Sequence, residues 1–172
     1  IFLSLTAASN VTGAITDLKR ISELKEKYRL TVSLDAAQYM PHFVLTAVDK
    51  CMLNQFDFVS FSAHKMMGST GVGVLYIGNE RLKSKDLKPF LYGGDMIQSV
   101  SKTEIIYKEL PYLLEAGTQN IADVIGFGAV LEWIASLGET NLRDAIDGKD
   151  VITKLLNIEG LELYHNQNHT NS

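Results

Sequence analysis

Short apolar segments alternate with helical patterns along the first half of the chain, and this alternation most restricts the possible folds. Three apolar runs have the length of buried strands, at residues 1–5, 30–34 and 56–61. Between the first two, Leu18, Ile21 and Leu24 share one face of a helix predicted over residues 15–28. A less regular helical segment, about residues 46–53, precedes the third run. Strands that alternate with helices indicate an α/β fold with a parallel sheet.

The second half of the chain gives a weaker pattern. A fourth strand, predicted over residues 72–77, follows the third too closely for a helical crossover, so we expect it to be antiparallel. Residues 88–118 show few periodic signals and are interpreted as a long irregular stretch, which in a compact domain is usually functional. The last predicted elements are a helix over residues 121–137, a polar helix over residues 141–156 and a strand over residues 161–164.

The predicted helix over residues 121–137 is almost entirely apolar but contains Gly126 and Gly128. Each glycine costs a helix about 1 kcal/mol relative to alanine. We therefore expect another backbone to pack closely against the helix at these two positions.

Composition excludes several classes of protein. The chain has 172 residues, of which 46% are apolar and 21% charged, as in an ordinary globular protein. Its net charge of −4 and the lack of a basic run predict no nucleic-acid partner, and no apolar run reaches the ~20 residues of a membrane span. The single cysteine, Cys51, allows no internal disulfide and no cysteine-pair metal site, and it is interpreted as a small buried residue. We expect a reducing, cytoplasmic location.

Polar side chains follow each of the first three predicted strands. They are Ser9 and Asn10 after the first, Asp35 and Gln38 after the second, and Ser62, His64 and Lys65 after the third. Taken singly, an aspartate at a strand end commonly caps a helix, and a loop lysine is usually solvated. In an open α/β sheet, however, the carboxyl ends of parallel strands share one edge, where ligands bind. We therefore expect these residues to form one site.

An acid, a lysine and a hydroxyl–imidazole pair together suit a pyridine aldehyde that carries a phosphate. The amine of Lys65 can condense with the aldehyde as a Schiff base. The carboxylate of Asp35 can pair with the pyridine nitrogen and keep it protonated. At ~4 Å and an effective dielectric constant near 20 this attraction is about 4 kcal/mol, on the order of three pKa units. The residues therefore predict pyridoxal 5'-phosphate as the cofactor.

Five motifs, in the same order, give the chain a resemblance to the class V aminotransferase group of pyridoxal-phosphate enzymes. They are "SNVTG", "VSLDAAQYMPH", "FSAHKMMGSTGVGVLY", "GGDMI" and "LEAGTQN". The third is the most specific, and the fourth resembles SUF-type cysteine desulfurases. The similarity spans about residues 3–137. It implies an incomplete large domain of the aspartate aminotransferase-like fold, with a mostly parallel sheet, one antiparallel strand and flanking helices.

The resemblance also implies a role for each predicted site residue at the ring. Lys65 would be the Schiff-base lysine and would move the α-proton of the substrate. Asp35 would pair with the pyridine nitrogen, and Asn10 and Gln38 would lie near the phenolic oxygen.

The phosphate and the second subunit complete these implied roles. Ser62 and His64 would hold the phosphate, and Thr118 would reach the phosphate of the other subunit's cofactor in a homodimer. Residues 1–138 would form the cofactor domain and residues 139–172 the start of a smaller C-terminal domain.

The family resemblance implies a cysteine desulfurase, which takes sulfur from L-cysteine, leaves L-alanine and forms an enzyme persulfide that a sulfur-acceptor protein uses in iron–sulfur cluster assembly. Three positions depart from the pattern: Ala7 replaces a histidine, Leu113 an arginine and Ser69 a proline. The family's nucleophilic cysteine and substrate-binding arginine would lie beyond this chain, so we expect the chain alone to be nearly inactive.

Two alternatives remain open from the sequence. The first is another class V enzyme, an aminotransferase, a kynureninase-like hydrolase or an epimerase. The second is a non-catalytic piece that serves dimer or partner contact.

Overall fold

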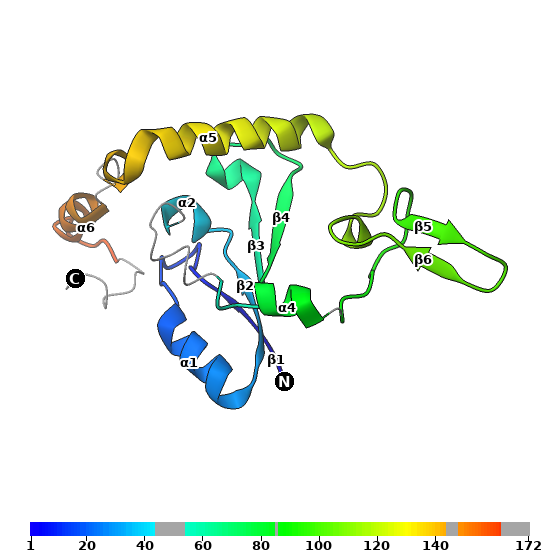
Figure 1. Ribbon diagram of the computed structural model, residues 1–172. Helices are drawn as coiled ribbons and strands as arrows, with labels where there is room; N and C mark the ends of the chain where they lie inside the picture. Colours follow the sequence, from blue (N-terminus) through cyan, green and yellow to red (C-terminus); the bar gives the residue numbers. More distant parts are fainter. Residues whose placement is uncertain (44–53, 85, 144–147, 163–172) are drawn as a thin grey trace.

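A four-stranded sheet organises the computed structural model, which describes residues 1–43, 54–84, 86–143 and 148–162 (Figure 1). Its strands run in the order β1 (Phe2–Thr6), β2 (Thr31–Asp35), β3 (Phe58–Ser62) and β4 (Gly73–Ile77). The first three are parallel, and β4 is antiparallel to β3. The expected α/β sheet with one antiparallel strand is confirmed.

Helices and 3₁₀ turns connect the strands of the sheet and continue along the chain beyond it (Figure 1). They are α1 (Leu18–Tyr28), α2 (Met40–Phe43), α4 (Asn79–Ser84), α5 (Ile121–Arg143), α6 (Gly148–Leu156) and the 3₁₀ turns η1 (Ala63–Met66) and η2 (Tyr112–Leu114). Helix α1 begins at Leu18, three residues later than the sequence predicts, because Asp17 caps it. Asp17 Oδ1 accepts a hydrogen bond of 2.9 Å from Arg20 N. Among the described residues, no helix has both the length and the apolar composition that crossing a membrane requires.

Several elements predicted from weak periodic patterns differ from the structure or lie outside the described residues. Residues 141–143 belong to the end of α5, and α6 covers residues 148–156, so the single predicted helix over residues 141–156 is wrong. Residues 161–162 are not in a strand. The predicted helix over residues 46–53, including Cys51, and the end of the last predicted strand lie outside the described residues.

A β-hairpin occupies the middle of the stretch that the sequence indicates as irregular. Strands β5 (Ile97–Val100) and β6 (Ile105–Tyr107) pair antiparallel with a bulge. Ser101 shapes their turn, because its Oγ accepts hydrogen bonds from Thr103 N (3.2 Å) and Glu104 N (3.0 Å). The interpretation as irregular was wrong because both strands are largely exposed, so neither carries an alternation of buried and exposed residues.

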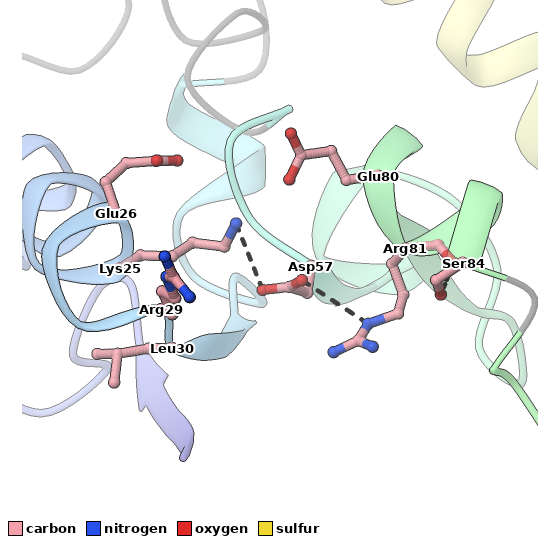
Figure 2. Close-up of a pocket in the computed structure, with 8 residues that line it drawn as sticks. All are labelled: Lys25, Glu26, Arg29, Leu30, Asp57, Glu80, Arg81 and Ser84. Carbon is pink, nitrogen blue, oxygen red and sulfur yellow. Dashed lines mark hydrogen bonds and ion pairs between the residues drawn. The ribbon is translucent and has the colours of Figure 1, made fainter.

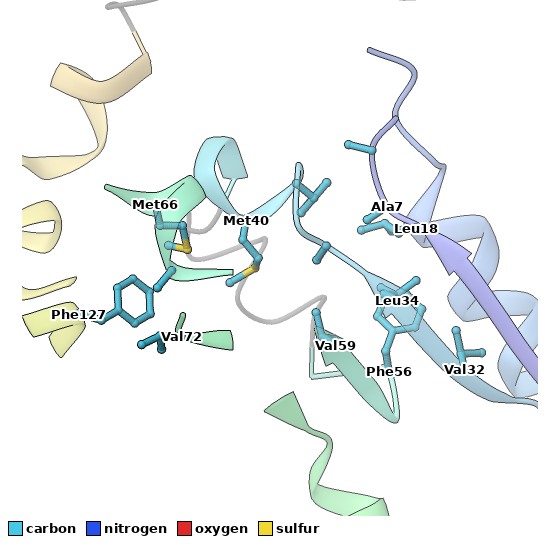
Figure 3. Packing of buried hydrophobic residues seen from close by; sticks show 14 residues of the cluster. Ala7, Leu18, Val32, Leu34, Met40, Phe56, Val59, Met66, Val72 and Phe127 are labelled. Carbon is cyan, nitrogen blue, oxygen red and sulfur yellow. The ribbon is translucent and has the colours of Figure 1, made fainter. Parts of the chain in front are cut away.

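The hydrophobic core lies between the sheet and its helices (Figure 3). Val32 and Leu34 alternate with exposed or half-buried residues along β2, and both are fully buried. Phe56, just before β3, and Val59 within it fill the space beside them. Burial of each such side chain contributes about 1.5–3 kcal/mol. The core therefore fixes which face of the central strands points inward.

A charged cluster joins elements at the amino ends of the parallel strands (Figure 2). Asp57, which precedes β3, accepts a 2.8 Å hydrogen bond from Val32 N through Oδ2. Lys25 Nζ of α1 lies 3.7 Å from the same oxygen, and Arg81 Nε of α4 lies 3.7 Å from Oδ1. The Asp57 side chain is only 11% exposed, so water screens these contacts weakly. One carboxylate thus ties two helices to the sheet.

We expect Asp57→Asn to lower the free energy of unfolding by about 2 kcal/mol, because it removes the counter-charge that two mostly buried cations share. Asp86→Asn is the matched control: Asp86 Oδ2 lies 3.5 Å from Arg81 Nη1, but the Asp86 side chain is 65% exposed. Its loss is expected to cost less than about 0.5 kcal/mol. Urea unfolding measures both, and equal losses would contradict a structural role for Asp57.

Gly126 and Gly128 do not meet the close packing that the sequence predicts. Both are exposed on α5, and an added β-carbon at either would have no atom of the described residues within 4 Å. The expectation of another backbone at these positions is therefore wrong within the described part of this chain. The buried residue of this turn is Phe127, which lies between them.

We expect Gly126→Ala to raise the free energy of unfolding by about 1 kcal/mol, because alanine favours a helix and meets no obstacle here. Chemical unfolding of the variant beside the unmodified protein measures the change. A loss of stability would show that something packs against the bare backbone at Gly126.

Candidate cofactor-binding site

The register of the parallel strands brings their carboxyl ends to the same side of the sheet. Thr6 of β1 pairs with Asp35 of β2, which in turn pairs with Ser60 of β3. The ladder continues one residue further, since Ala7 N donates to Asp35 O and Ala36 N donates to Ser60 O, both at 2.8 Å. The three strands therefore leave the sheet on the same side, and β3 continues two residues beyond Ser60, to Ser62.

Each strand is followed by a small, fully buried residue before the chain turns outward. These residues are Ala7, Ala36 and Ala63. No bulky side chain therefore follows directly after any of the three strands. Ala7, which replaces a histidine of the family pattern, belongs to this buried layer and is 0% exposed.

The first exit forms a tight turn that presents Asn10. Ser9 Oγ accepts hydrogen bonds of 3.2 Å from both Val11 N and Thr12 N. Gly13 closes the turn with a positive φ of 69°, a conformation in which a β-carbon is strained. The Ser9 hydroxyl therefore shapes the backbone, and Asn10 is left exposed at the edge of the sheet.

The second exit holds Asp35 and Gln38. Asp35 is exposed at the end of β2, and its Oδ1 accepts a 3.0 Å hydrogen bond from Ala37 N. This bond fixes the carboxylate relative to its own backbone. Gln38 is half-buried in the turn that follows, just before the buried residues Tyr39 and Met40.

The third exit is the turn η1, which carries His64 and Lys65. Ser62 is the last residue of β3, and its side chain makes no capping hydrogen bond to η1. His64 and Lys65 are exposed, whereas the residues on either side of them, Ala63 and Met66, are buried. The turn thus anchors itself in the core and projects an imidazole and an amine from the edge of the sheet.

Thr118 is not part of this group of side chains. It lines a separate pocket of about 300 Å³ with Asp95, Tyr112, Glu115 and other residues around the start of α5. Its expected role concerns the cofactor of a second subunit, so it stays a prediction.

The pocket of about 320 Å³ in Figure 2 lies at the opposite edge of the sheet. Its lining includes Lys25 and Arg81, which contact Asp57. The charges of these three residues already face one another. We therefore assign this pocket to the packing of α1 and α4 and not to the cofactor.

The carboxyl edge offers a nucleophilic amine, a fixed carboxylate, and a hydroxyl and an imidazole on neighbouring strands. This donor set fits a ligand with a carbonyl for Lys65, a basic ring nitrogen for Asp35 and a phosphate for Ser62 and His64. The sequence predicted these residues, but it did not indicate how the turn around Lys65 is held. The glycine at position 68, three residues after Lys65 in the motif "FSAHKMMGSTGVGVLY", was the one sequence feature that could have indicated close packing at this turn.

Comparison with known proteins gives the chain a family. The model of the family described as aminotransferase class-V matches residues 2–172. A probable cysteine desulfurase of Pasteurella multocida is 43% identical over 136 residues, which are 78% of this chain and 31% of that protein. The cysteine desulfurase CsdA of Escherichia coli is 42% identical over 133 residues, which are 77% of this chain and 32% of that protein. The chain thus spans about a third of the length of these two relatives.

Solved structures agree with the sequence comparison. The crystal structure of E. coli cysteine desulfurase CsdA superposes with a TM-score of 0.74 and 37% identity, over 90% of this chain and 36% of that one. The apo structure of a cysteine desulfurase from Thermococcus onnurineus gives a TM-score of 0.79 and 30% identity, over 97% of this chain and 41% of that one. The chain therefore belongs to the aminotransferase class-V family of pyridoxal-phosphate-dependent enzymes, which includes the cysteine desulfurases.

Proposed function

We propose that the chain forms the cofactor-binding core of a cysteine desulfurase, which removes sulfur from L-cysteine and yields L-alanine and an enzyme persulfide. The observation that carries the proposal is that Asp35, at the end of β2, and the Lys65 turn, directly after β3, both lie at the carboxyl edge of the sheet. The similarity to cysteine desulfurases of 42–43% identity supports the choice of reaction.

Lys65 is the proposed catalytic residue. Pyridoxal phosphate, when bound, supplies an aldehyde and an electron-accepting ring. The Nζ atom of Lys65 would hold the cofactor through its aldehyde, and as a free amine it would accept the proton from the α-carbon of L-cysteine. The exposed position of Lys65 on η1 gives its amine access to both groups.

Asp35 provides the charge that keeps the ring nitrogen protonated. Its carboxylate is held in place by the hydrogen bond from Ala37 N, so little reorientation is needed when a positive charge is brought to it. Asn10 and Gln38 are proposed to hydrogen-bond the ring substituents from the neighbouring exits.

Ser62 and His64 are proposed to bind the phosphate, because a hydroxyl and an imidazole can both donate hydrogen bonds to its oxygens. Thr118 is proposed to reach the phosphate of a second subunit's cofactor in a homodimer. The division at residue 138 between a cofactor domain and a smaller C-terminal domain also belongs to the proposal.

The sulfur is proposed to pass to an acceptor protein for iron–sulfur cluster assembly in the cytoplasm. Cys51 lies outside the described residues and is not assigned as the nucleophile that receives the sulfur. Release of L-alanine and sulfide from L-cysteine, measured on the complete protein, distinguishes this activity from transamination, hydrolysis or epimerisation by another class V enzyme.

We expect the protein to become yellow when pyridoxal phosphate is added, through a Schiff base with Lys65, and Lys65→Ala to abolish the absorbance band. Lys102→Ala, which removes an exposed lysine in the β5–β6 turn, serves as the control and should keep the band. Borohydride reduction and peptide mass spectrometry then locate the modified lysine. A band of normal intensity in Lys65→Ala would overturn the assignment.

We expect Asp35→Asn in the complete protein to lower kcat/KM for L-cysteine by about two to three orders of magnitude, since ~4 kcal/mol of charge pairing corresponds to about a thousandfold in rate. The amide oxygen can still accept the hydrogen bond from Ala37 N, so the turn should keep its shape. Nitrogen-15 NMR of labelled cofactor reports the protonation of the ring nitrogen. Unchanged kinetics would contradict the role given to Asp35.

A further inference from the structure

The turn that carries Lys65 is too short to hold itself in place. The element η1 contains four residues in 3₁₀ conformation, whose hydrogen bonds are few and of poor geometry. Lys65 itself is exposed and lies between core residues. The position of its backbone must therefore come from the buried groups around the turn.

The residues after Lys65 adopt a conformation that requires such support. Met67 has a φ of 63°, in the left-handed region that residues other than glycine seldom adopt. Gly68 N then donates a 2.9 Å hydrogen bond to Ala63 O, and Ala63 N donates a 3.1 Å bond to Val72 O. A non-glycine residue keeps this conformation only where its surroundings impose it.

Phe127 of α5 supplies the nearest support. A β-carbon at Gly68 would lie 2.8 Å from Phe127 Cδ2 and 3.0 Å from both Ala63 O and Ala63 Cβ. The aromatic ring therefore lies directly against the bare α-carbon of Gly68, on the segment that closes the Lys65 turn. Phe127 belongs to the same buried cluster as Met66 and Val72, as Figure 3 shows.

Phe127 is the side chain of α5 whose atom lies nearest to a β-carbon built at Gly68. In the first turns of α5, Ile121, Val124 and Ile125 are exposed, whereas Phe127 is 5% exposed. Ile134, also buried at 6%, lies seven residues further along α5 and is not among the atoms that crowd Gly68. Among the apolar residues at the start of α5, Phe127 is therefore the buried one that lies against the Lys65 turn.

We propose that Phe127 is a positioning residue for Lys65: its ring packs against Gly68 and holds the turn that directs the lysine amine to the cofactor. The inference rests on the proposed function for the identity of Lys65 as the cofactor lysine. The packing itself does not depend on that function. A smaller side chain at position 127 leaves Gly68 without a neighbour on this side, so the strained backbone at Met67 relaxes and Lys65 samples more positions.

The first measurement is hydrogen exchange of the Ala63 and Gly68 amides in the complete protein without cofactor. We expect Phe127→Leu to speed exchange at these amides by about tenfold, because it shortens the group that closes the turn. Ile134→Ala is the control, since it removes a buried side chain of the same helix and lowers overall stability without touching the turn. In this control, the exchange rates of the Ala63 and Gly68 amides relative to those of the sheet amides should stay unchanged.

The second measurement is the pH titration of the Schiff-base absorbance after addition of pyridoxal phosphate. Phe127→Leu should shift the midpoint and weaken cofactor binding several-fold, and Gly68→Ala should do the same by pushing the ring away. Phe127→Met has about the volume of leucine but a longer, unbranched side chain that still reaches Gly68, and it should stay within about twofold of the unmodified protein. Ile134→Ala should keep the original midpoint.

The two measurements separate the inference from the function on which it rests. Absence of a Schiff base in the unmodified protein would refute the proposed function, while the exchange data would still decide whether Phe127 holds the turn. Equal effects of Phe127→Leu and Ile134→Ala, or no effect of Phe127→Leu on the Ala63 and Gly68 amides, would overturn the role of Phe127.

Discussion

The backbone register of the three parallel strands is the constraint on which the rest of the structure depends. Hydrogen bonds pair Thr6 with Asp35 and Asp35 with Ser60. A slip of one residue would turn Val32 and Leu34 out of the core and would move Asp35 to the other face of the sheet. The same apolar side chains that stabilise the sheet therefore also decide which polar groups meet at its edge.

The amino and carboxyl edges of this sheet differ in what their charged residues do. At the amino ends of the strands, Asp57 satisfies Val32 N and attracts Lys25 and Arg81, so opposite charges are brought together and the helices are fastened. At the carboxyl ends, Asp35 and Lys65 are exposed and carry groups that a ligand can use. The charged cluster that stabilises the fold and the residues proposed to bind the cofactor are thus about one strand length apart. A substitution at one edge of the sheet can therefore leave the arrangement of residues at the other edge unchanged.

How much the sequence could predict varied with the range of the contacts involved. The strand ends with Asp35 and Lys65 were predictable, because apolar runs and the residues that follow them are local signals. The β5–β6 hairpin was not, because its apolar residues, Ile97 and Ile105 among them, face outward and give no alternating pattern. The packing of Phe127 on Gly68 joins residues 59 positions apart, and no local pattern in α5 distinguishes Phe127 from the apolar residues around it.

The strand order β1-β2-β3-β4 has a consequence for how the chain behaves in solution. In the described residues, β1 and β4 each pair with a strand on one side only, and Leu75 on β4 is 53% exposed. The free side of a strand presents unpaired amide and carbonyl groups to any other extended chain, and an exposed apolar residue beside them favours such contact. Colloidal stability of the chain therefore depends on what covers these two borders, and conditions that leave them bare favour aggregation by strand addition.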